Sequence, residues 1–132
     1  MDIVARRSIE VPGLHHGGLP IPQACVVGNL LVSSGISPLD PGTGTVPVDP
    51  ADQVELVFAN ARRVLDAAGG RPEDVAKCTV FVRDKAIRPL VDKYWTEMFS
   101  DADARPARHT LRIDLAEPLR IQLEIIALLG EG

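Results

Sequence analysis

Residues 105–129 read RPARHTLRIDLAEPLRIQLEIIALL and consist of two apolar runs with a polar segment between them. Alternation within each run predicts two β-strands, one over residues 107–115 and one from Arg120 onward, joined by a turn at Ala116-Glu117. Three of the four arginines in this stretch stand among residues that otherwise favour burial: Arg108, Arg112 and Arg120. A buried charge is costly without a partner, so these arginines need a counter-ion or a ligand.

The first of these strands divides its side chains between the two faces of the predicted sheet. The face that we assign to the core beneath the helices carries His109, Leu111, Ile113 and Leu115. The opposite face carries Arg108, Thr110, Arg112 and Asp114. With the turn at residues 116–117, Thr110 lies opposite Gln122 and Arg108 lies opposite Glu124. Two interpretations follow. Either Arg108 and Glu124 form a cross-strand ion pair with Arg112 and Arg120 in solvent, or an arginine fork binds a ligand carboxylate.

The preceding residues combine strands with a helix. Residues 2–9 predict an edge strand, and residues 23–35 predict a hairpin with its turn at Gly28-Asn29. A helix between Asp49, which caps it, and Gly69-Gly70, which ends it, is indicated by apolar residues spaced by three and four. These residues are Val54, Val57, Phe58, Ala61, Val64, Leu65 and Ala68.

A further strand and a second helix precede the opening stretch. The strand is predicted over residues 76–83, and the helix is predicted to begin near Pro89. The apolar side chains that this second helix buries are Val91, Tyr94, Trp95, Met98 and Phe99.

The order of elements predicts a single α+β domain over residues 1–132, with a mixed sheet and two helices on one of its faces. Two helices cover one side of a sheet, yet residues 30–32 and 125–129 are apolar at every position. A strand exposed on one side would alternate between apolar and polar residues. The continuous apolar runs therefore predict that another subunit covers the second face.

The composition disfavours several classes of function. The 14 basic and 18 acidic side chains give a net charge of −4, which argues against nucleic-acid binding. No apolar run is long enough to span a membrane, and MDIVARRSIEVPG lacks a signal-peptide core, so we expect a cytoplasmic protein. Cys25 and Cys78 lie in apolar runs, which favours buried free thiols, and no Cys/His spacing predicts a metal site.

Five segments together resemble the Rid family, the reactive intermediate deaminases also called YjgF or L-PSP proteins. These segments are VVGNLLVSSGISPLDPGTG, VLDAAGG, EDVAKCTVFVRD, RPARHTLRIDL and IQLEIIALL, and the resemblance runs from about residue 20 to the C-terminus. It implies a chorismate-mutase-like subunit and a homotrimer whose sheets pack into a central barrel. It also implies intersubunit clefts where water hydrolyses an imine or enamine and releases ammonia, with no cofactor and no metal.

The resemblance implies site residues as well. Arg108 aligns with the arginine that binds the substrate carboxylate, and Thr110, Ser34 and Gly35 align with backbone contacts to the ligand. Four positions depart from the family pattern: Gln122 replaces a glutamate, Ile21 a tyrosine, Asp92 an asparagine and His109 a serine or threonine. A neutral amide can hold a water but cannot act as a general base. The chain therefore keeps the carboxylate-binding arginine without the usual proton-handling group.

Histidines are alternative proton carriers, because imidazole titrates near neutrality. His15 and His16 precede the region that lines the cleft in the family, and His109 follows Arg108, although alternation directs the two side chains apart.

Three hypotheses remain. The first is hydrolytic deamination of a carboxylate-bearing imine such as 2-iminopropanoate or an aminomuconate-like compound. The second is a non-catalytic trimer that binds small carboxylates, which the change to Gln122 favours. The third, RNA cleavage, is disfavoured by the sequence pI of 5.3.

Overall fold

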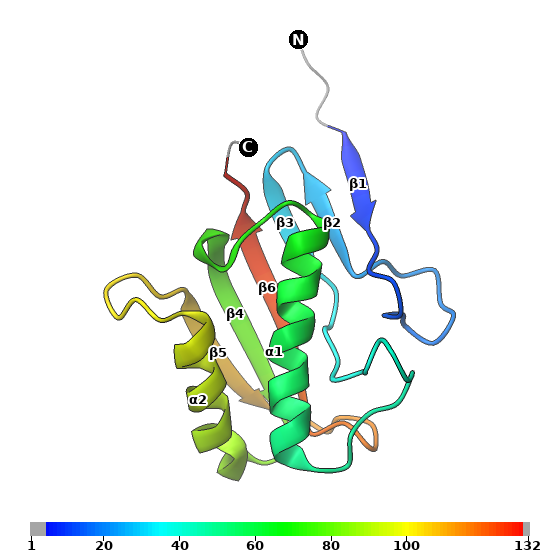
Figure 1. Cartoon of the computed structure of the whole chain (residues 1–132), viewed down its shortest axis with the longest axis vertical. Coiled ribbons are helices and arrows are strands. Elements are labelled where there is room, and N and C mark those ends of the chain that lie inside the picture. The colour runs from blue at the N-terminus through cyan, green and yellow to red at the C-terminus, as the bar shows by residue number, and fades with distance from the viewer. Residues whose placement is uncertain (1–4, 131–132) are drawn as a thin grey trace.

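Six strands form one mixed sheet in the order β1-β2-β3-β6-β4-β5, in a computed structural model that describes residues 5–130 (Figure 1). The strands are β1 (Arg6–Ile9), β2 (Ala24–Val27), β3 (Leu30–Ser33), β4 (Val75–Val82), β5 (Ala107–Arg112) and β6 (Ile121–Leu128). The strand predicted over residues 2–9 corresponds to β1, and its residues 2–4 lie outside the described residues. The hairpin turn at Gly28-Asn29 is confirmed, with Gly28 at φ 62°.

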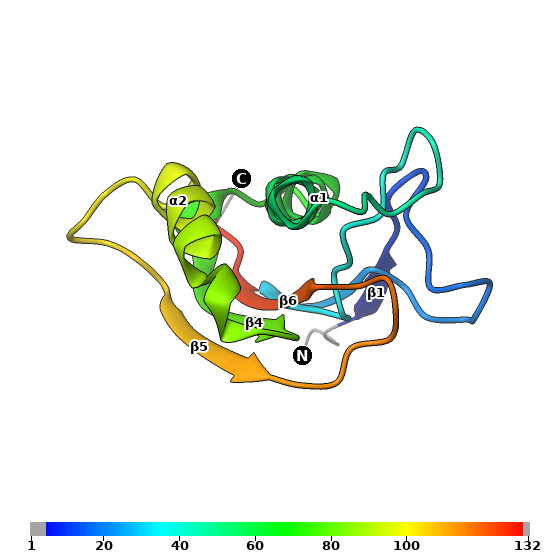
Figure 2. The ribbon, with the colours of Figure 1, turned by 90° about the horizontal axis from the view of Figure 1, so that it is seen from below.

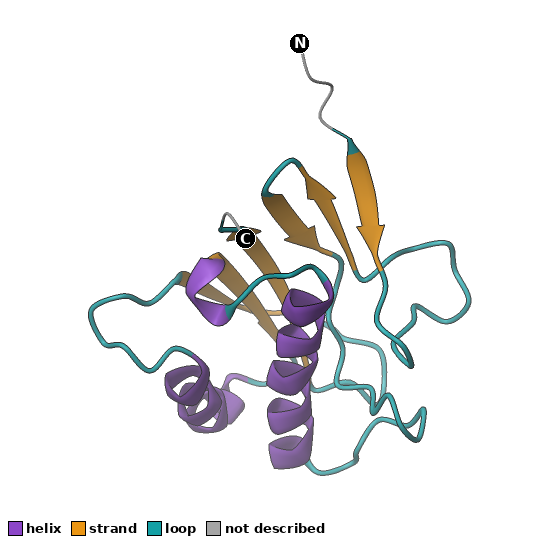
Figure 3. Cartoon of the chain, turned by 45° about the horizontal axis from the view of Figure 1, so that its top comes forward, coloured by secondary structure: helices purple, strands orange, loops and turns teal. Residues whose placement is uncertain are grey.

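Two helices cover one face of this sheet, as predicted (Figures 2 and 3). Helix α1 (Pro50–Ala67) begins after Asp49, whose carboxylate accepts from the Ala51 N–H at 2.7 Å, and it ends before Gly69 at φ 79°. Both ends are where the sequence placed them, because a cap and a left-handed glycine act locally. Helix α2 (Arg88–Met98) has Pro89 in its first turn. Short 3₁₀ turns precede β4 and α2, namely η1 (Pro72–Asp74) and η2 (Lys85–Ile87).

The predicted hairpin between the last two strands is wrong. β5 pairs with β4 in parallel, and β6 lies on the other side of β4 and pairs with it antiparallel. β4, α2 and β5 form a crossover unit, and the loop after β5 then passes beyond β4 to reach β6 (Figure 2). The composition of the strands explains the placement. β6 has a buried residue at every second position and is central, whereas β5 carries charged side chains that suit the edge of a sheet.

The register also corrects the predicted faces of β5. Arg108 pairs with Cys78 and Thr110 pairs with Val80, and both β4 residues are buried beneath the helices. Side chains of paired residues point to the same side of a sheet, so Arg108 and Thr110 face the helix layer. His109 is exposed and lies on the opposite, open face rather than in the core. The prediction failed because that open face is itself partly apolar, so hydrophobicity did not identify the covered side.

The open face carries a row of exposed apolar side chains on three adjacent strands. The members, 39% to 56% exposed, are Val27, Leu30, Val32, Ile126 and Leu128. The register places Leu30 beside both Val27 and Leu128, and Val32 beside Ile126, so the row is continuous. We refer to these five residues as the apolar row. Cys25, predicted to be buried, lies beside Val32 and is half-buried, whereas Cys78 is buried as predicted.

A buried amide in α1 holds the segment that follows β3. Asn60 Nδ2 donates to the carbonyl oxygens of Ser37 and Leu39 at 2.8 and 2.9 Å. The segment then pairs with β6, because Ile36 and Leu123 exchange two backbone hydrogen bonds of 2.7 and 2.9 Å. Gly35 and Ser37 are thereby fixed beside β6. No helix within residues 5–130 is long and apolar enough to cross a membrane.

Candidate active site

Arg108 lies on the edge strand β5 and is held by groups from two elements. Its Nη1 forms an ion pair with the Asp92 carboxylate of α2 at 2.8 Å, and its Nε donates to Thr110 Oγ1 at 3.2 Å. Its guanidinium carbon lies 5.2 Å from the centre of the Trp95 ring, within the range of a cation–π contact. The side chain is 19% exposed, and within residues 5–130 its Nη2 has no hydrogen bond or ion pair. The proposed ion pair with Glu124 is therefore wrong.

An open cavity of about 590 Å³ lies in front of this arginine, and we refer to it as the Arg108 cavity. Its lining is polar and consists of Lys85, Arg88, Asp92, Arg108, His109 and Thr110. Two sequence-predicted ligand contacts, Asp92 and Thr110, are thus brought together with Arg108. His109 also lines the cavity, because the cavity extends around the free edge of β5 to the open face.

The free edge of β5 contributes backbone donors to the same cavity. Ile113 N–H donates to the Val82 carbonyl at 2.9 Å, so the backbone groups of Ile113 face β4. Backbone groups alternate in direction along a parallel strand, and the N–H of Thr110 therefore points away from β4. An outward N–H beside Arg108 is a second donor available to an anion.

Gln122 forms the centre of a second group of candidate residues, on β6. Its register partner is Phe81, which lies on the face opposite to Cys78 and Val80, so Gln122 lies on the open face of the sheet. Gln122 Nε2 donates to Ser37 Oγ at 3.1 Å. Gly35 packs directly on this amide: a Cβ atom at Gly35 would lie 2.8 Å from Gln122 Cδ. The sequence predicted both Gly35 and Gln122, but not the contact with Ser37.

The loop before β2 is tied to Gly35 by a histidine. His16 Nε2 lies 2.9 Å from the Gly35 carbonyl oxygen, and its Nδ1 lies 3.3 Å from Gln23 Nε2 and 3.2 Å from the Ile21 carbonyl oxygen. In the tautomer with a proton on Nε2, this nitrogen donates to Gly35 and Nδ1 accepts from Gln23, and the Ile21 carbonyl, itself an acceptor, then makes no hydrogen bond with Nδ1. His16 thus orients the backbone around Gly35.

The other predicted loop residues lie nearby. Ser34 Oγ donates to the Pro22 carbonyl at 2.8 Å, and Ile21 is 43% exposed. His15 accepts from the Gly17 N–H at 3.1 Å in the same loop.

Arg108 and Gln122 do not meet within one chain. Arg108 faces the helix layer at the edge strand, whereas Gln122 lies on the open face, with β4 between their strands. The predicted juxtaposition of Thr110 and Gln122 is wrong for the same reason. The chain therefore carries two separate groups, which we call the Arg108 group (Arg108, Thr110, Asp92) and the Gln122 group (Gln122, Gly35, Ser34, Ile21).

Sequence reasoning missed several residues around these groups. Lys85 and Arg88 line the Arg108 cavity, and Trp95 supports the guanidinium. Helical spacing offered a signal: Arg88, Asp92 and Trp95 are four and three residues apart and share one face of α2. The contacts of Ser37 with Gln122 and of His16 with Gly35 left no comparable signal, since both join segments that are far apart in the sequence.

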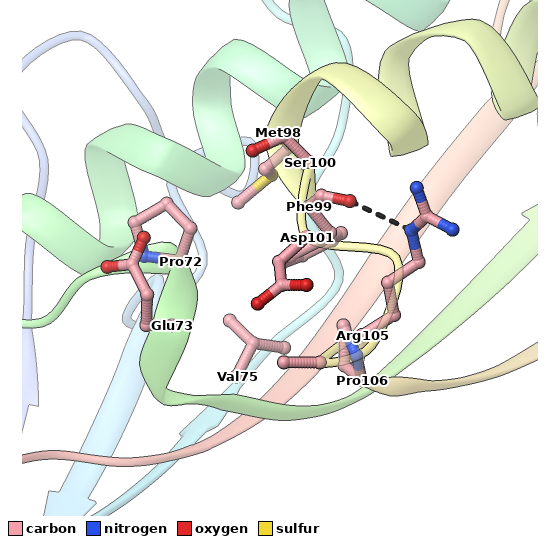
Figure 4. Close-up of a pocket in the computed structure, with 10 residues that line it drawn as sticks. Pro72, Glu73, Val75, Met98, Phe99, Ser100, Asp101, Arg105 and Pro106 are labelled. Carbon is pink, nitrogen blue, oxygen red and sulfur yellow. Dashed lines mark hydrogen bonds between the residues drawn. The ribbon is translucent and has the colours of Figure 1, made fainter.

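A different pocket, of about 310 Å³, lies between the C-terminal end of α2 and the start of β4 (Figure 4). Glu73, Asp101 and Arg105 are its charged lining residues, and it contains none of the candidate site residues. Arg105 Nε donates to the Phe99 carbonyl at 2.9 Å, and its guanidinium points away from Glu73 (Figure 4).

Burial also defines the chemistry of Cys78, which lies beneath Arg108. Burial raises the pKa of the Cys78 thiol from 9.0 to about 12, and the positive charge of Arg108 offsets part of this rise. A neutral, enclosed thiol is a poor nucleophile, so Cys78 acts as a packing residue.

Comparison with known proteins places the chain in a family. The family described as Endoribonuclease L-PSP matches residues 20–129. The chain is 34% identical over 110 residues to the 2-iminobutanoate/2-iminopropanoate deaminase of Escherichia coli, covering 82% of this chain and 86% of that protein. A RutC family protein of Pyrococcus horikoshii has the same identity and coverage. The chain belongs to the Rid/L-PSP family, as the resemblance indicated.

Solved structures agree with this assignment. The YjgF gene product of Escherichia coli superposes with a TM-score of 0.83 at 31% identity, covering 92% of this chain and 98% of that one. Escherichia coli TdcF, solved with bound serine, gives a TM-score of 0.84 at 27% identity, covering 94% and 99%. The α+β architecture of mixed sheet and two helices is that of the YjgF proteins.

Proposed function

We propose that this protein hydrolyses a reactive imine or enamine that bears a carboxylate, and releases ammonia. The observation that carries the proposal is Arg108, a largely buried arginine with one free amino group at the edge of a polar cavity. A guanidinium can bind a carboxylate through two parallel hydrogen bonds: here Nη2 is available for one of them, and the ligand gains the second at Nη1 by displacing Asp92, while Trp95 supports the guanidinium. The name of the Escherichia coli relative, a 2-iminobutanoate/2-iminopropanoate deaminase, supports the same chemistry.

The reaction consumes one water and releases one ammonia. Water adds to the imine carbon, and the resulting carbinolamine loses ammonia as its C–N bond breaks and its oxygen becomes a carbonyl. Arg108 binds the carboxylate and places the imine carbon, while the outward N–H of Thr110 donates to the ligand. Gln122 donates to Ser37, which leaves its amide oxygen available to orient the attacking water. An imine is reactive enough for such positioning to accelerate its hydrolysis.

The complete site is formed between copies of the chain. Arg108 and Gln122 lie on opposite faces of the sheet, so one chain supplies each group to a different cleft. The exposed apolar row supports association, because contiguous apolar surface on a single chain marks a protein interface. We propose a homotrimer in which the open faces of three sheets enclose the centre. The Arg108 group of one subunit then meets the Gln122 group of the next.

A second candidate function is binding of small carboxylates without turnover. Two observations favour it. Gln122 cannot accept a proton as a general base, and Asp92 already forms an ion pair with Nη1 of Arg108. Ribonuclease activity, which the family description names, is disfavoured by the net charge of −4.

The test is ammonia release from 2-iminopropanoate that an amino-acid oxidase generates from alanine. The wild-type chain is expected to accelerate hydrolysis, and Arg108→Ala to reduce the acceleration by at least about 30-fold, as loss of a charge-assisted carboxylate contact implies. Arg112→Ala is the matched control, since this exposed arginine lies on the same strand outside the cavity. No acceleration by the wild-type protein, together with carboxylate binding that depends on Arg108, would establish the binding function instead.

A further inference from the structure

Two basic residues line the Arg108 cavity in addition to Arg108. Lys85 is the first residue of η2 and Arg88 is the first residue of α2, so both lie at the N-terminal end of the helix that carries Asp92. Neither forms an ion pair with a carboxylate within residues 5–130. Arg88 and Asp92 are spaced for an ion pair along the helix, yet Asp92 pairs with Arg108 instead. Lys85 and Arg88 are therefore cations without a protein partner in this cavity.

The positive charge of the cavity is larger than a single carboxylate can neutralise. Lys85, Arg88 and Arg108 contribute three positive charges and Asp92 contributes one negative charge, so the sum is 3 − 1 = +2. The positive end of the α2 dipole lies at the same place. A monocarboxylate would neutralise half of this charge, whereas a dianion would neutralise all of it.

The size of the cavity agrees with a ligand longer than a three-carbon imino acid. In a single chain the open cavity has a volume of about 590 Å³, which leaves room for such a ligand beside the groups that the next subunit is proposed to add. Lys85 and Arg88 come from η2 and the start of α2, whereas Arg108 comes from β5, so the cations reach the cavity from two different layers of the fold. Cations supplied from two layers suit a ligand with two anionic groups.

We propose that the ligand is a dicarboxylate, with one carboxylate bound by Arg108 and the second by Lys85 and Arg88. This inference rests on the proposed function, since it takes Arg108 as the site of the first carboxylate. The substrate class is then the imines of amino dicarboxylic acids, whose products are 2-oxo dicarboxylates. Asp92 lies between the two carboxylate positions and faces the amino or imino nitrogen, which is positively charged when protonated.

The experiment compares two imines generated by oxidases in the same assay, 2-iminoglutarate from glutamate and 2-iminopropanoate from alanine. The wild-type protein is expected to hydrolyse 2-iminoglutarate with a kcat/KM at least about tenfold higher. The double variant K85Q/R88Q is expected to lower this ratio about tenfold. Lys93→Gln is the matched control: it removes one cation from α2 outside the cavity and is expected to keep the ratio.

A binding measurement separates failure of this inference from failure of the proposed function. Calorimetry with 2-oxoglutarate and pyruvate, at low and at physiological ionic strength, needs no turnover. Tighter binding of 2-oxoglutarate that K85Q/R88Q abolishes supports the dicarboxylate site even when neither imine is hydrolysed. Equal affinity for the two ligands, or a preference that K85Q/R88Q leaves unchanged, would overturn it, whatever the deaminase activity.

Discussion

Asp92 and Arg108 form an ion pair of 2.8 Å between α2 and β5, and the same guanidinium lies over the ring of Trp95. The arginine that should bind a ligand carboxylate is thus already bound to a carboxylate of the protein. The Asp92 side chain is 62% exposed, so solvent screens the pair and a ligand can compete with it. We therefore expect the affinity of the site for anions to depend on Asp92 as well as on Arg108.

Replacement of Asp92 by asparagine is expected to tighten carboxylate binding. The change removes a competing anion and raises the net charge of the cavity by one, so the Kd for pyruvate should fall about three- to tenfold. Isothermal calorimetry measures it. Glu97→Gln, on the same helix but outside the cavity, is the control and should leave the Kd unchanged. Unchanged or weaker binding in Asp92→Asn would show that Asp92 supports Arg108 rather than competing with the ligand.

Gln122→Glu is expected to raise hydrolysis of 2-iminopropanoate by at least about tenfold, a barrier change of roughly 1.4 kcal/mol. The new carboxylate has nearly the same shape, can accept from the Ser37 hydroxyl, and can take a proton from water. Ammonia release under identical conditions compares the two proteins. Fast wild-type turnover that the substitution leaves unchanged would place proton handling elsewhere, and His15, His16 and His109 would be tested next.

Gly35→Ala is expected to reduce activity while the fold persists. The added methyl group would approach within 2.8 Å of Gln122 Cδ, so the flexible amide must move away from Ser37. We expect kcat to fall at least about tenfold, because the displaced Gln122 amide would no longer hold the attacking water in position. Circular dichroism and thermal unfolding serve as the check on folding. Full activity in Gly35→Ala would mean that the position of Gln122 is irrelevant to the reaction.

Mixing two inactive variants is expected to restore activity. Arg108→Ala damages one group of the site and Gln122→Ala the other, and subunit exchange creates clefts in which both groups are intact. Activity should recover to on the order of one quarter of the wild-type value for random equimolar mixing, because about three quarters of the trimers are then mixed and each has one intact cleft of three. The check is ammonia release after partial unfolding and refolding of an equimolar mixture. Absence of recovery in mixtures shown to contain mixed oligomers would refute the intersubunit site.

Stability is expected to decline in alkali through Cys78. Its pKa is raised from 9.0 to about 12 by burial, so the folded state favours the neutral thiol. The stabilising contribution is complete below about pH 9 and is lost as the pH rises toward 12. Between pH 8 and pH 10 it should fall by about 1.4 kcal/mol relative to Cys78→Ala at equal protein concentration. Denaturant titrations measure both proteins, and parallel pH profiles would contradict a buried neutral thiol.

Features set by neighbouring residues could be predicted from the sequence. The ends of α1 follow from Asp49 and Gly69, and the hairpin of β2 and β3 follows from a two-residue turn, so both are as predicted. These signals act over a few residues and do not depend on the remainder of the chain.

Strand pairing depends on distant parts of the chain and could not be predicted in the same way. The short segment between β5 and β6 suggested a hairpin, but the two strands pair on opposite sides of β4. The faces of Arg108 and His109 were reversed for a different reason, because the open face is itself partly apolar and hydrophobicity did not identify the covered side. The ion pair with Asp92 required knowledge that α2 lies over β5, which no local pattern contains. The resemblance named Asp92 as a site residue without its pairing with Arg108.

The apolar row on the open face also makes a newly synthesised chain prone to aggregation. A single chain exposes Val27, Leu30, Val32, Ile126 and Leu128 together, and a contiguous apolar strip of this kind is prone to aggregate. In the proposed homotrimer this strip is the subunit interface, so assembly and aggregation compete for the same surface. Slow expression at low temperature, or a charged residue in place of Val32, is therefore expected to raise the yield of soluble protein.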